Sequence, residues 1–233
     1  MLNLILSILP GVLIIIYIYK RDKHEREPYR YILICVLLGM LSCIPAIAGT
    51  LSVEAMMGVN NPSASKNMMT VATYAFIAVA LSEEFAKFLF LRFYIYRKPE
   101  FDEPMDGIVY AVTISMGFAI LENVLYVLEG GLHVAILRMF TAVPGHAAFG
   151  VIMGYYVGLA KFESDQVKST RLMLQGLLFA AFVHGAYDFF LFQNNYAALS
   201  ILAFVVLIVG VYMSKKLIKE HVDNSPHRHH SEI

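Results

Sequence analysis

The sequence predicts an all-α protein, a polytopic transmembrane helical bundle with about seven spans, and three observations support this. Of the 233 residues, 58% are hydrophobic and only 15% are charged. The mean hydropathy is +0.63, which is typical of a polytopic membrane protein and too high for a soluble domain. Long apolar stretches alternate with short polar ones, and the basic residues gather in alternate connections.

The apolar stretches run over residues 2–19, 31–51, 70–91, 107–128, 139–160, 172–192 and 197–213. Each is long enough to cross about 30 Å of hydrocarbon as a helix. The first follows Met1 without a basic segment or a small-residue cleavage site, so we expect a retained span. We therefore expect one integral-membrane domain over residues 1–215, with a motif-bearing core at about 70–190, and a disordered cytoplasmic tail over 216–233.

The basic residues predict the orientation of the chain. The Lys and Arg residues number 18, and all but Lys66, Lys87 and Arg138 fall in connections on one predicted side or in the tail. The positive-inside rule therefore predicts an outside N-terminus and a cytoplasmic C-terminus. We interpret the mixed-charge run from Lys20 to Arg30 as a solvated turn next to the membrane.

The stretch Ser82-Glu83-Glu84-Phe85-Ala86-Lys87 stands near the end of the third apolar run. A charge inside a membrane costs roughly 2.5 kcal/mol or more, so these residues need partners. On a helix Glu83 and Lys87 are four residues apart and share a face, whereas Glu84 is rotated by about 100°. We expect Lys87 to hold one acid, by this spacing Glu83, and to leave the other for chemistry.

Two further spans carry ionisable residues. Glu122, followed by Asn123, has no basic residue within a helical turn, so its counter-charge comes from another helix or it stays protonated. His184 and Asp188 are four residues apart on one helical face, where the carboxylate can fix the tautomer of the imidazole.

The fifth span is interrupted by Pro144-Gly145-His146. Gly150, Gly154 and Gly158 follow His146 at steps of four residues and form a small-residue stripe that lets another helix pack closely. We therefore expect His146 to face protein and not lipid.

The predicted depths bring these residues together. At 1.5 Å per residue, Glu122, His146 and His184 lie about 9–12 Å below the outer edge of the hydrocarbon, and Glu83 and Glu84 about 20 Å below it. One polar cluster is compatible with these depths. Chemistry alone leaves three alternatives to an enzyme open: residues that only hold helices together, a proton-coupled transporter, and a non-catalytic assembly or immunity protein.

The ordered set of motifs resembles the PrsW family of bacterial intramembrane proteases. The set is Glu83-Glu84-x-x-Lys87, Phe118-x-x-x-Glu122-Asn123, Arg138 with His146, and His184-x-x-Tyr187-Asp188. It is similar in turn to the wider group of CAAX-processing proteases, in which the second motif usually carries histidine where this chain has Glu122.

The resemblance implies an intramembrane endopeptidase in the bacterial cell membrane that cuts a membrane-anchored protein. In the PrsW family the expected reaction is the first cut, on the outer side, of a single-span anti-sigma factor in a stress response. The expected partners are this substrate and membrane lipids. Nucleic-acid binding has no basic face to support it.

The residues also suggest roles in the chemistry. Glu83 or Glu84 is expected to act as general base on a water, with the other paired to Lys87. His184, oriented by Asp188, is expected to assist as an acid or to polarise the carbonyl, and Asn123 or His146 to stabilise the oxyanion. The resemblance adds Phe118 and Arg138 as supporting residues.

Metal is the open point in this mechanism. Chemistry without a metal is favoured on sequence grounds, because the His-x-x-x-His spacing of helix-borne zinc proteases is missing. Zinc is the alternative, with Glu84, Glu122, His146 and His184 as its ligands.

Overall fold

The protein is described from a computed structural model that covers residues 2–193 and 197–227. It is helical throughout these residues, with short connections. The α-helices are α1 (Leu2–Arg21), α2 (Tyr29–Met57), α3 (Met68–Thr73), α4 (Ser82–Phe93), α5 (Pro104–Phe140), α6 (Ala142–Phe162), α7 (Gln166–Leu191) and α8 (Ser200–Asp223). A π-helical segment, η2 (Tyr74–Leu81), joins α3 to α4, and three short 3₁₀ turns are η1 (Pro62–Ala64), η3 (Ile95–Arg97) and η4 (Ala197–Leu199).

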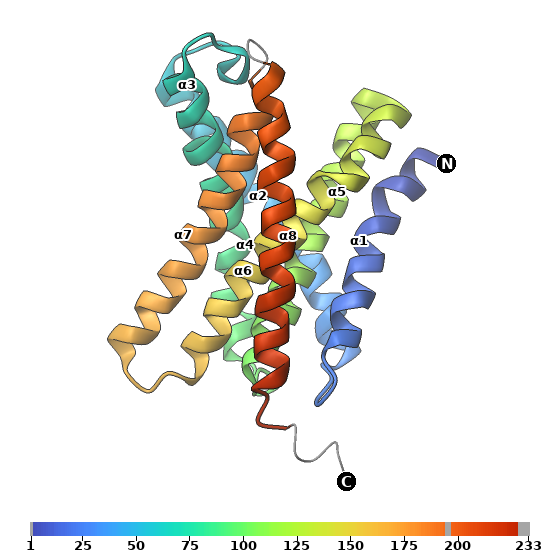
Figure 1. Ribbon diagram of the computed structural model, residues 1–233, viewed down its shortest axis with the longest axis vertical. Coiled ribbons are helices and arrows are strands. Elements are labelled where there is room, and N and C mark those ends of the chain that lie inside the picture. Colours follow the sequence, from blue (N-terminus) through green and yellow to red (C-terminus); the bar gives the residue numbers. More distant parts are fainter. Residues whose placement is uncertain (1, 194–196, 228–233) are drawn as a thin grey trace.

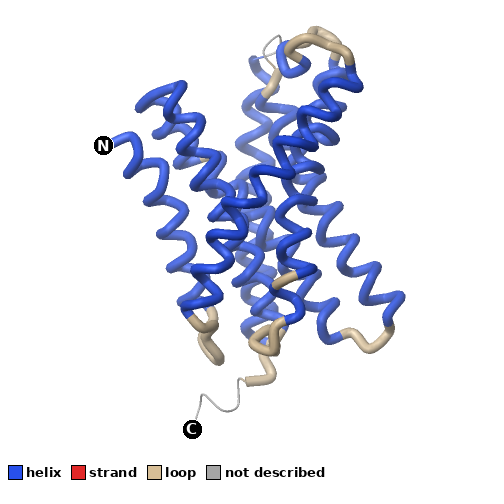
Figure 2. Tube along the Cα trace, turned by 180° about the vertical axis from the view of Figure 1, so that it is seen from behind, coloured by secondary structure: helices blue, strands red, loops and turns tan. Residues whose placement is uncertain are grey.

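The helices form one bundle in which α5 and α6 are central (Figures 1 and 2). In the most apolar stretch of α5–α6, 78% of the residues are buried, against 28% in each of α1, α2 and α8. The outer helices therefore turn large apolar side chains outward, among them Ile5, Leu33 and Ile208. Such an exposed apolar face is stable only in contact with lipid or another apolar surface.

Within the described residues, five helical stretches are long and apolar enough to cross a membrane: Asn3–Arg21, Tyr29–Met57, Pro104–Phe162, Gln166–Leu191 and Ser200–Asp223. The count differs from the sequence prediction for two reasons. The third predicted span is divided among α3, η2 and α4, and the fourth and fifth join into one long helical run. An all-helical membrane protein is thus confirmed, while the seven spans and the orientation of the termini stay predictions.

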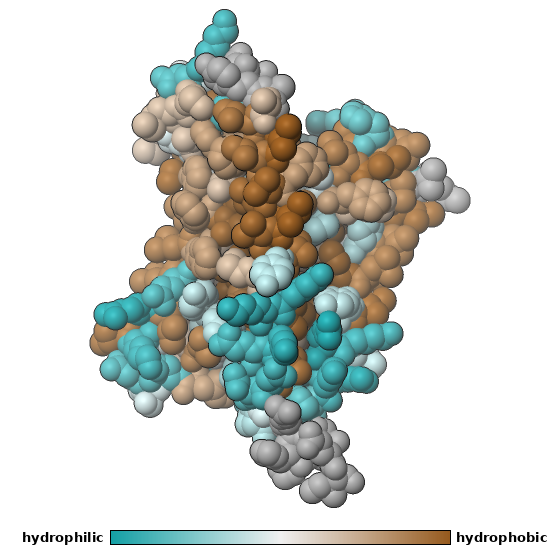
Figure 3. Space-filling view, viewed as in Figure 1, coloured by the Kyte–Doolittle hydropathy of each residue, from teal (hydrophilic) through white to brown (hydrophobic). Residues whose placement is uncertain are grey.

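Polar residues gather at one end of the bundle. Figure 3 shows hydrophilic residues around the end where α8 stops, below a broad hydrophobic surface. We call this the basic end; it holds the α1–α2, α4–α5 and α6–α7 connections and the last turns of α8 (Figure 1). The chain begins at the opposite end, as the predicted topology requires.

Helix α8 continues to Asp223, beyond residue 215 where the sequence prediction ends the membrane domain. The last turns are held by other helices. His221 is buried and its Nδ1 lies 2.9 Å from the carbonyl oxygen of Pro104, while Tyr155 donates to Glu220 at 2.7 Å. Residues 216–223 are therefore helical and not disordered, because α5 and α6 supply partners. Residues 228–233 of the predicted tail lie outside the described residues.

The glycine stripe of α6 packs directly on the start of α5, as predicted. A Cβ atom at Gly154 would overlap the carbonyl of Gly107, and one at Gly158 would overlap the carbonyl of Pro104. These contacts are between backbones, so the two helices approach as closely as small residues permit. The same packing turns His146 inward, where it is only 4% exposed.

Replacing Gly154 by Val is expected to force α5 and α6 apart, because backbone atoms cannot move out of the way. Overpacking of this kind costs about 1–3 kcal/mol, and we expect the unfolding temperature in detergent to fall by about 5 °C or more. Gly210→Ala is the matched control, since its Cβ would lie 3.6 Å from the Cβ of Ala148, an ordinary contact. Equal unfolding temperatures for Gly154→Val and the unchanged protein would contradict this packing.

Candidate active site

The double glutamate opens α4 directly after the π-helical segment η2. Single π-helical turns are often found at functional sites, because they shift the side chains that follow. Glu83 is 8% exposed and Glu84 is fully buried. One oxygen of each, Oε2, is buried without a hydrogen-bond partner. Two carboxylates thus enter the bundle interior with unused acceptor capacity.

Lys87 binds the acids of its own helix and one histidine. Its Nζ lies 2.7 Å from Glu84 Oε1, 3.6 Å from Glu83 Oε2 and 3.2 Å from His146 Nδ1. It also lies 4.1 Å from the centre of the Phe118 ring, a cation–π contact that gives Phe118 its supporting role. The predicted Glu83–Lys87 pair is present, but residues three apart also meet on a helix, and Glu84 is the closer partner of Lys87.

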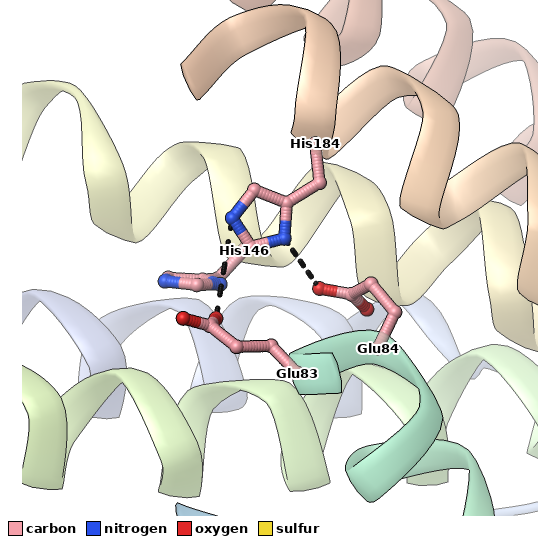
Figure 4. Close-up of side chains that lie close together, drawn as sticks. All are labelled: Glu83, Glu84, His146 and His184. Atoms are coloured by element: carbon pink, nitrogen blue, oxygen red, sulfur yellow. Dashed lines mark hydrogen bonds and ion pairs between the residues drawn. The ribbon is translucent and has the colours of Figure 1, made fainter. Parts of the chain in front are cut away.

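His184 of α7 lies between three carboxylates. Its Nδ1 is 2.9 Å from Glu84 Oε1, and its Nε2 is 3.3 Å from Asp188 Oδ2 and 3.9 Å from Glu83 Oε2. Figure 4 shows His184 above the two glutamates, with His146 beside them. The ring of Phe149 stacks on His184 with centres 4.6 Å apart. The predicted His184–Asp188 pair is therefore present, and the imidazole is held at both ring nitrogens and on the face that Phe149 covers.

Glu122 obtains its counter-charge from Arg138 of the same helix. Residues 16 apart on a straight helix would lie about 24 Å from each other, yet Arg138 Nη2 is 2.5 Å from Glu122 Oε2. The chain reverses between them at Gly131, where φ is 70° and ψ is −159°, a conformation that favours glycine. Arg138 Nε also donates to Asn123 Oδ1 at 2.7 Å. The prediction of a partner beyond Glu122's own helical segment therefore holds for Arg138, which follows the kink at Gly131, and for His146 of α6, whose Nε2 is 2.9 Å from Glu122 Oε2.

A cavity of about 260 Å³ opens on this cluster. Its lining includes residues that surround His184 and residues that surround Glu122. They are Glu83, Glu122, Arg138, His146, His184 and Asp188. A second cavity of about 260 Å³ lies against α2 and shares Glu83 and Glu122. A larger groove of about 980 Å³ lies over α6 and α7 between Tyr156, Thr170 and Phe182, and contains none of the predicted site residues. The ionisable residues predicted from four spans therefore meet at one cavity.

The donor set fits a metal such as zinc. Glu83, Glu84, His146 and His184 each offer one nitrogen or oxygen atom, and these atoms lie within 4.8 Å of one another. Imidazole nitrogens and carboxylate oxygens are ordinary zinc ligands. The ligand set differs from the sequence hypothesis in one member: Glu122 is bound to Arg138, and Glu83 takes its place in the group.

Residues 27–213 match a family described as PrsW family intramembrane metalloprotease. The chain belongs to the PrsW family. It is 41% identical over 192 residues to Protease PrsW of Geobacillus kaustophilus, which covers 81% of this chain and 79% of that protein. It is 32% identical over 212 residues to Protease PrsW of Bacillus subtilis, covering 90% and 93% of the two chains. No solved structure matches the chain.

Membership of the PrsW family confirms the resemblance drawn from the motifs. The chain is therefore a multi-pass protein of the bacterial membrane and an intramembrane peptide hydrolase. The shared identity extends over most of each relative, so the family's fold and not only a short motif is shared.

Two aromatic residues of this PrsW-family site were missed by sequence reasoning. Tyr126 lies beneath the guanidinium of Arg138, with 4.1 Å between the ring centre and Cζ, and Phe149 stacks on His184. A signal for both was available. Tyr126 follows Glu122 by four residues and Phe149 follows His146 by three, so each shares a helical face with a predicted site residue.

Proposed function

We propose that the protein hydrolyses a peptide bond in a single-span membrane protein, using a water held in the cavity beside Glu83. The observation that supports this most strongly is the meeting of four helices, α4, α5, α6 and α7, at one cavity. Pairs that only held helices together would not need a cavity or carboxylate oxygens without a hydrogen bond. Family membership supports the same chemistry.

Glu83 is our choice for the general base. It borders both cavities, and its Oε2 has no hydrogen-bond partner. Glu84 is fully buried and already binds Lys87 and His184 through Oε1. Glu84 therefore suits a binding role in the cluster, and Glu83 is the glutamate that can take a proton from water.

We propose that Glu84, His146 and His184 hold a zinc ion, with Glu83 beside it. When bound, zinc lowers the pKa of a coordinated water from about 15.7 to about 7. The family's description as a metalloprotease and the compact donor set favour this over the metal-free chemistry that the sequence alone favours. Asp188 lies 3.3 Å from His184 Nε2 and would orient the imidazole as a ligand. The proton that Glu83 takes from the water would then pass to the leaving amine.

Arg138 is our choice for the group that stabilises the oxyanion. Its guanidinium lines the cavity and is fixed from several sides, by Glu122, Asn123 and the ring of Tyr126. A preorganised positive charge beside a reacting carbonyl is the usual means of stabilising a tetrahedral intermediate. Asn123 uses its oxygen to hold Arg138, so we assign it positioning instead of the oxyanion role expected from sequence.

The substrate class that we propose is an anti-sigma factor with one transmembrane segment. Glu122 lies about 14 Å along α5 from Gly131 but about 27 Å from Pro104, so the site is nearer the end opposite the basic end. With the predicted orientation this is the outer half of the membrane, which supports a cut on the outer side.

The test is reconstitution of the full-length protein in liposomes with a purified single-span anti-sigma factor. We expect cleavage within the substrate's transmembrane segment or just outside it on the outer side, mapped by mass spectrometry of the fragments. A single-span protein with an unrelated sequence serves as the specificity control. Absence of cleavage together with proton-coupled flux of a solute would instead support a transporter.

A further inference from the structure

A second group of acids lies at the basic end, far from the cavity. Asp22 and Glu27 come from the α1–α2 connection, and Glu103 and Asp106 from the start of α5; each is at most 1% exposed. The sequence interpretation of Lys20 to Arg30 as a solvated turn is therefore wrong for these two acids. They are buried because the connection folds against α5, where Tyr110 donates to Glu27.

Helix capping explains only part of this group. Glu103 and Asp106 form a capping box at the start of α5, and Asp106 Oδ2 accepts from the backbone N–H groups of Asp102 and Glu103, each at 2.8 Å. Ser225 donates to Glu103. Neither Asp22 nor Glu27 takes part in the capping box, so another reason is needed for burying them here.

Several carboxylate oxygens in the group are buried without a hydrogen-bond partner. They are both oxygens of Asp22, Oε1 of Glu27 and Oδ1 of Asp106. Among the ion pairs of residues 2–193 and 197–227, none joins a lysine or arginine to Asp22, Glu27, Glu103 or Asp106. When these acids are ionised, no lysine or arginine of the described residues pairs with them to balance their charge.

The geometry suits one ion. Asp22, Glu103 and Asp106 each offer an oxygen, and these oxygens lie within 4.8 Å of one another. Ligand oxygens at 2.3–2.6 Å from one Ca²⁺ can be up to about 5 Å apart, and those of Mg²⁺ up to about 4.2 Å. The ligands are oxygens alone, without histidine or cysteine, which is the donor set of hard cations and not of zinc.

We propose that Asp22, Glu103 and Asp106 bind a hard divalent cation, Mg²⁺ or Ca²⁺, at the basic end. The ion joins the α1–α2 connection to the start of α5. Since Ser225 also binds Glu103, the end of α8 is held at the same point. The site is separate from the zinc chemistry proposed above and does not depend on it, because α5 carries the two sites about 24 Å apart.

Protons compete with the cation for the carboxylates of this site. Burial, with the neighbouring carboxylates of Asp106 and Glu103, raises the pKa of Asp22 to about 8. Because this folded-state pKa is raised, protonation stabilises the ion-free protein at low pH, and that stabilisation is lost as the pH rises through about 8. The experiment is therefore done at pH 8.5, where protons compete less for Asp22 than they do at neutral pH.

The test uses the full-length protein, purified in detergent and freed of metal by a chelator. Adding Mg²⁺ or Ca²⁺ to about a hundredfold excess over Kd is expected to raise the unfolding temperature by about 5–10 °C. Isothermal titration should give one site per chain, and comparison of the two ions identifies the preferred one. K⁺ at equal ionic strength should not reproduce the effect.

Asp22→Asn should abolish both the heat of binding and the rise in unfolding temperature. Asp102→Asn is the matched control, because this neighbouring acid has a half-exposed side chain outside the group, and it should keep both. An unchanged response in Asp22→Asn would overturn the proposal. So would an unmodified protein that gives no heat with either ion but is stabilised by acid, since protons would then hold the group together. The test measures the heat of binding and the unfolding temperature, and neither zinc content nor cleavage. Its result is therefore independent of the proposed protease mechanism.

Discussion

Glu83→Gln is expected to lower the rate of substrate cleavage by about 10²- to 10⁴-fold, the usual contribution of a general base. The amide keeps the size of the side chain but cannot take a proton from water. Glu83 is not the closest partner of Lys87, so the buried ion pair with Glu84 remains and the unfolding temperature should change little. The measurement is the initial rate of fragment formation in liposomes, at matched amounts of folded protein.

Two further variants make this result specific to Glu83. Glu54→Gln is the matched control, because Glu54 lines the second cavity but lies outside the cluster, and it should cleave at the normal rate. Glu84→Gln should lose stability as well as activity, since it removes a buried partner of Lys87 and His184 and such losses cost about 3–5 kcal/mol. Full activity in a correctly folded Glu83→Gln protein would exclude Glu83 as the base.

Removal of zinc is expected to have an effect at least as large. The protein treated with a chelator should lose cleavage by about 10²-fold or more, because the water would return to its ordinary pKa. Zinc, added back at one equivalent, should restore the rate, whereas Mg²⁺ should not, since imidazole ligands favour zinc. Elemental analysis of the active protein should give one zinc per chain.

His184→Gln tests the ligand assignment. This variant should contain no zinc and should not be rescued by adding it. His133→Gln is the control, because His133 is an exposed residue of α5 outside the donor group, and it should keep its zinc and its activity. Full cleavage by a protein that elemental analysis finds free of zinc and other transition metals would decide for metal-independent glutamate chemistry.

The sequence by itself determined the class of the protein and singled out the ionisable residues that meet at the cavity. Apolar stretches of spanning length require helices, since the backbone has no other way to pair its polar groups in lipid. An ionisable residue in such a stretch is costly, so Glu83, Glu84, Glu122, His146 and His184 stood out without a structure. Their order along the chain was enough to indicate the PrsW family.

Only the tertiary structure decided which groups are partners. Lys87 is within reach of two acids on its own helix, and the position of His184 and His146 around it sets the closer contact with Glu84. Arg138 reaches Glu122 only because the chain reverses at Gly131, which a helical projection of the sequence cannot represent.

The acids of the α1–α2 connection illustrate the limit most clearly. In the sequence Asp22 and Glu27 stand among lysines and arginines, and such mixed-charge runs are usually solvated. The fold instead buries them against the start of α5, beside two further acids more than 75 residues away. Local composition shows that a residue is polar enough to be solvated, but only long-range packing determines whether its side chain is exposed or buried.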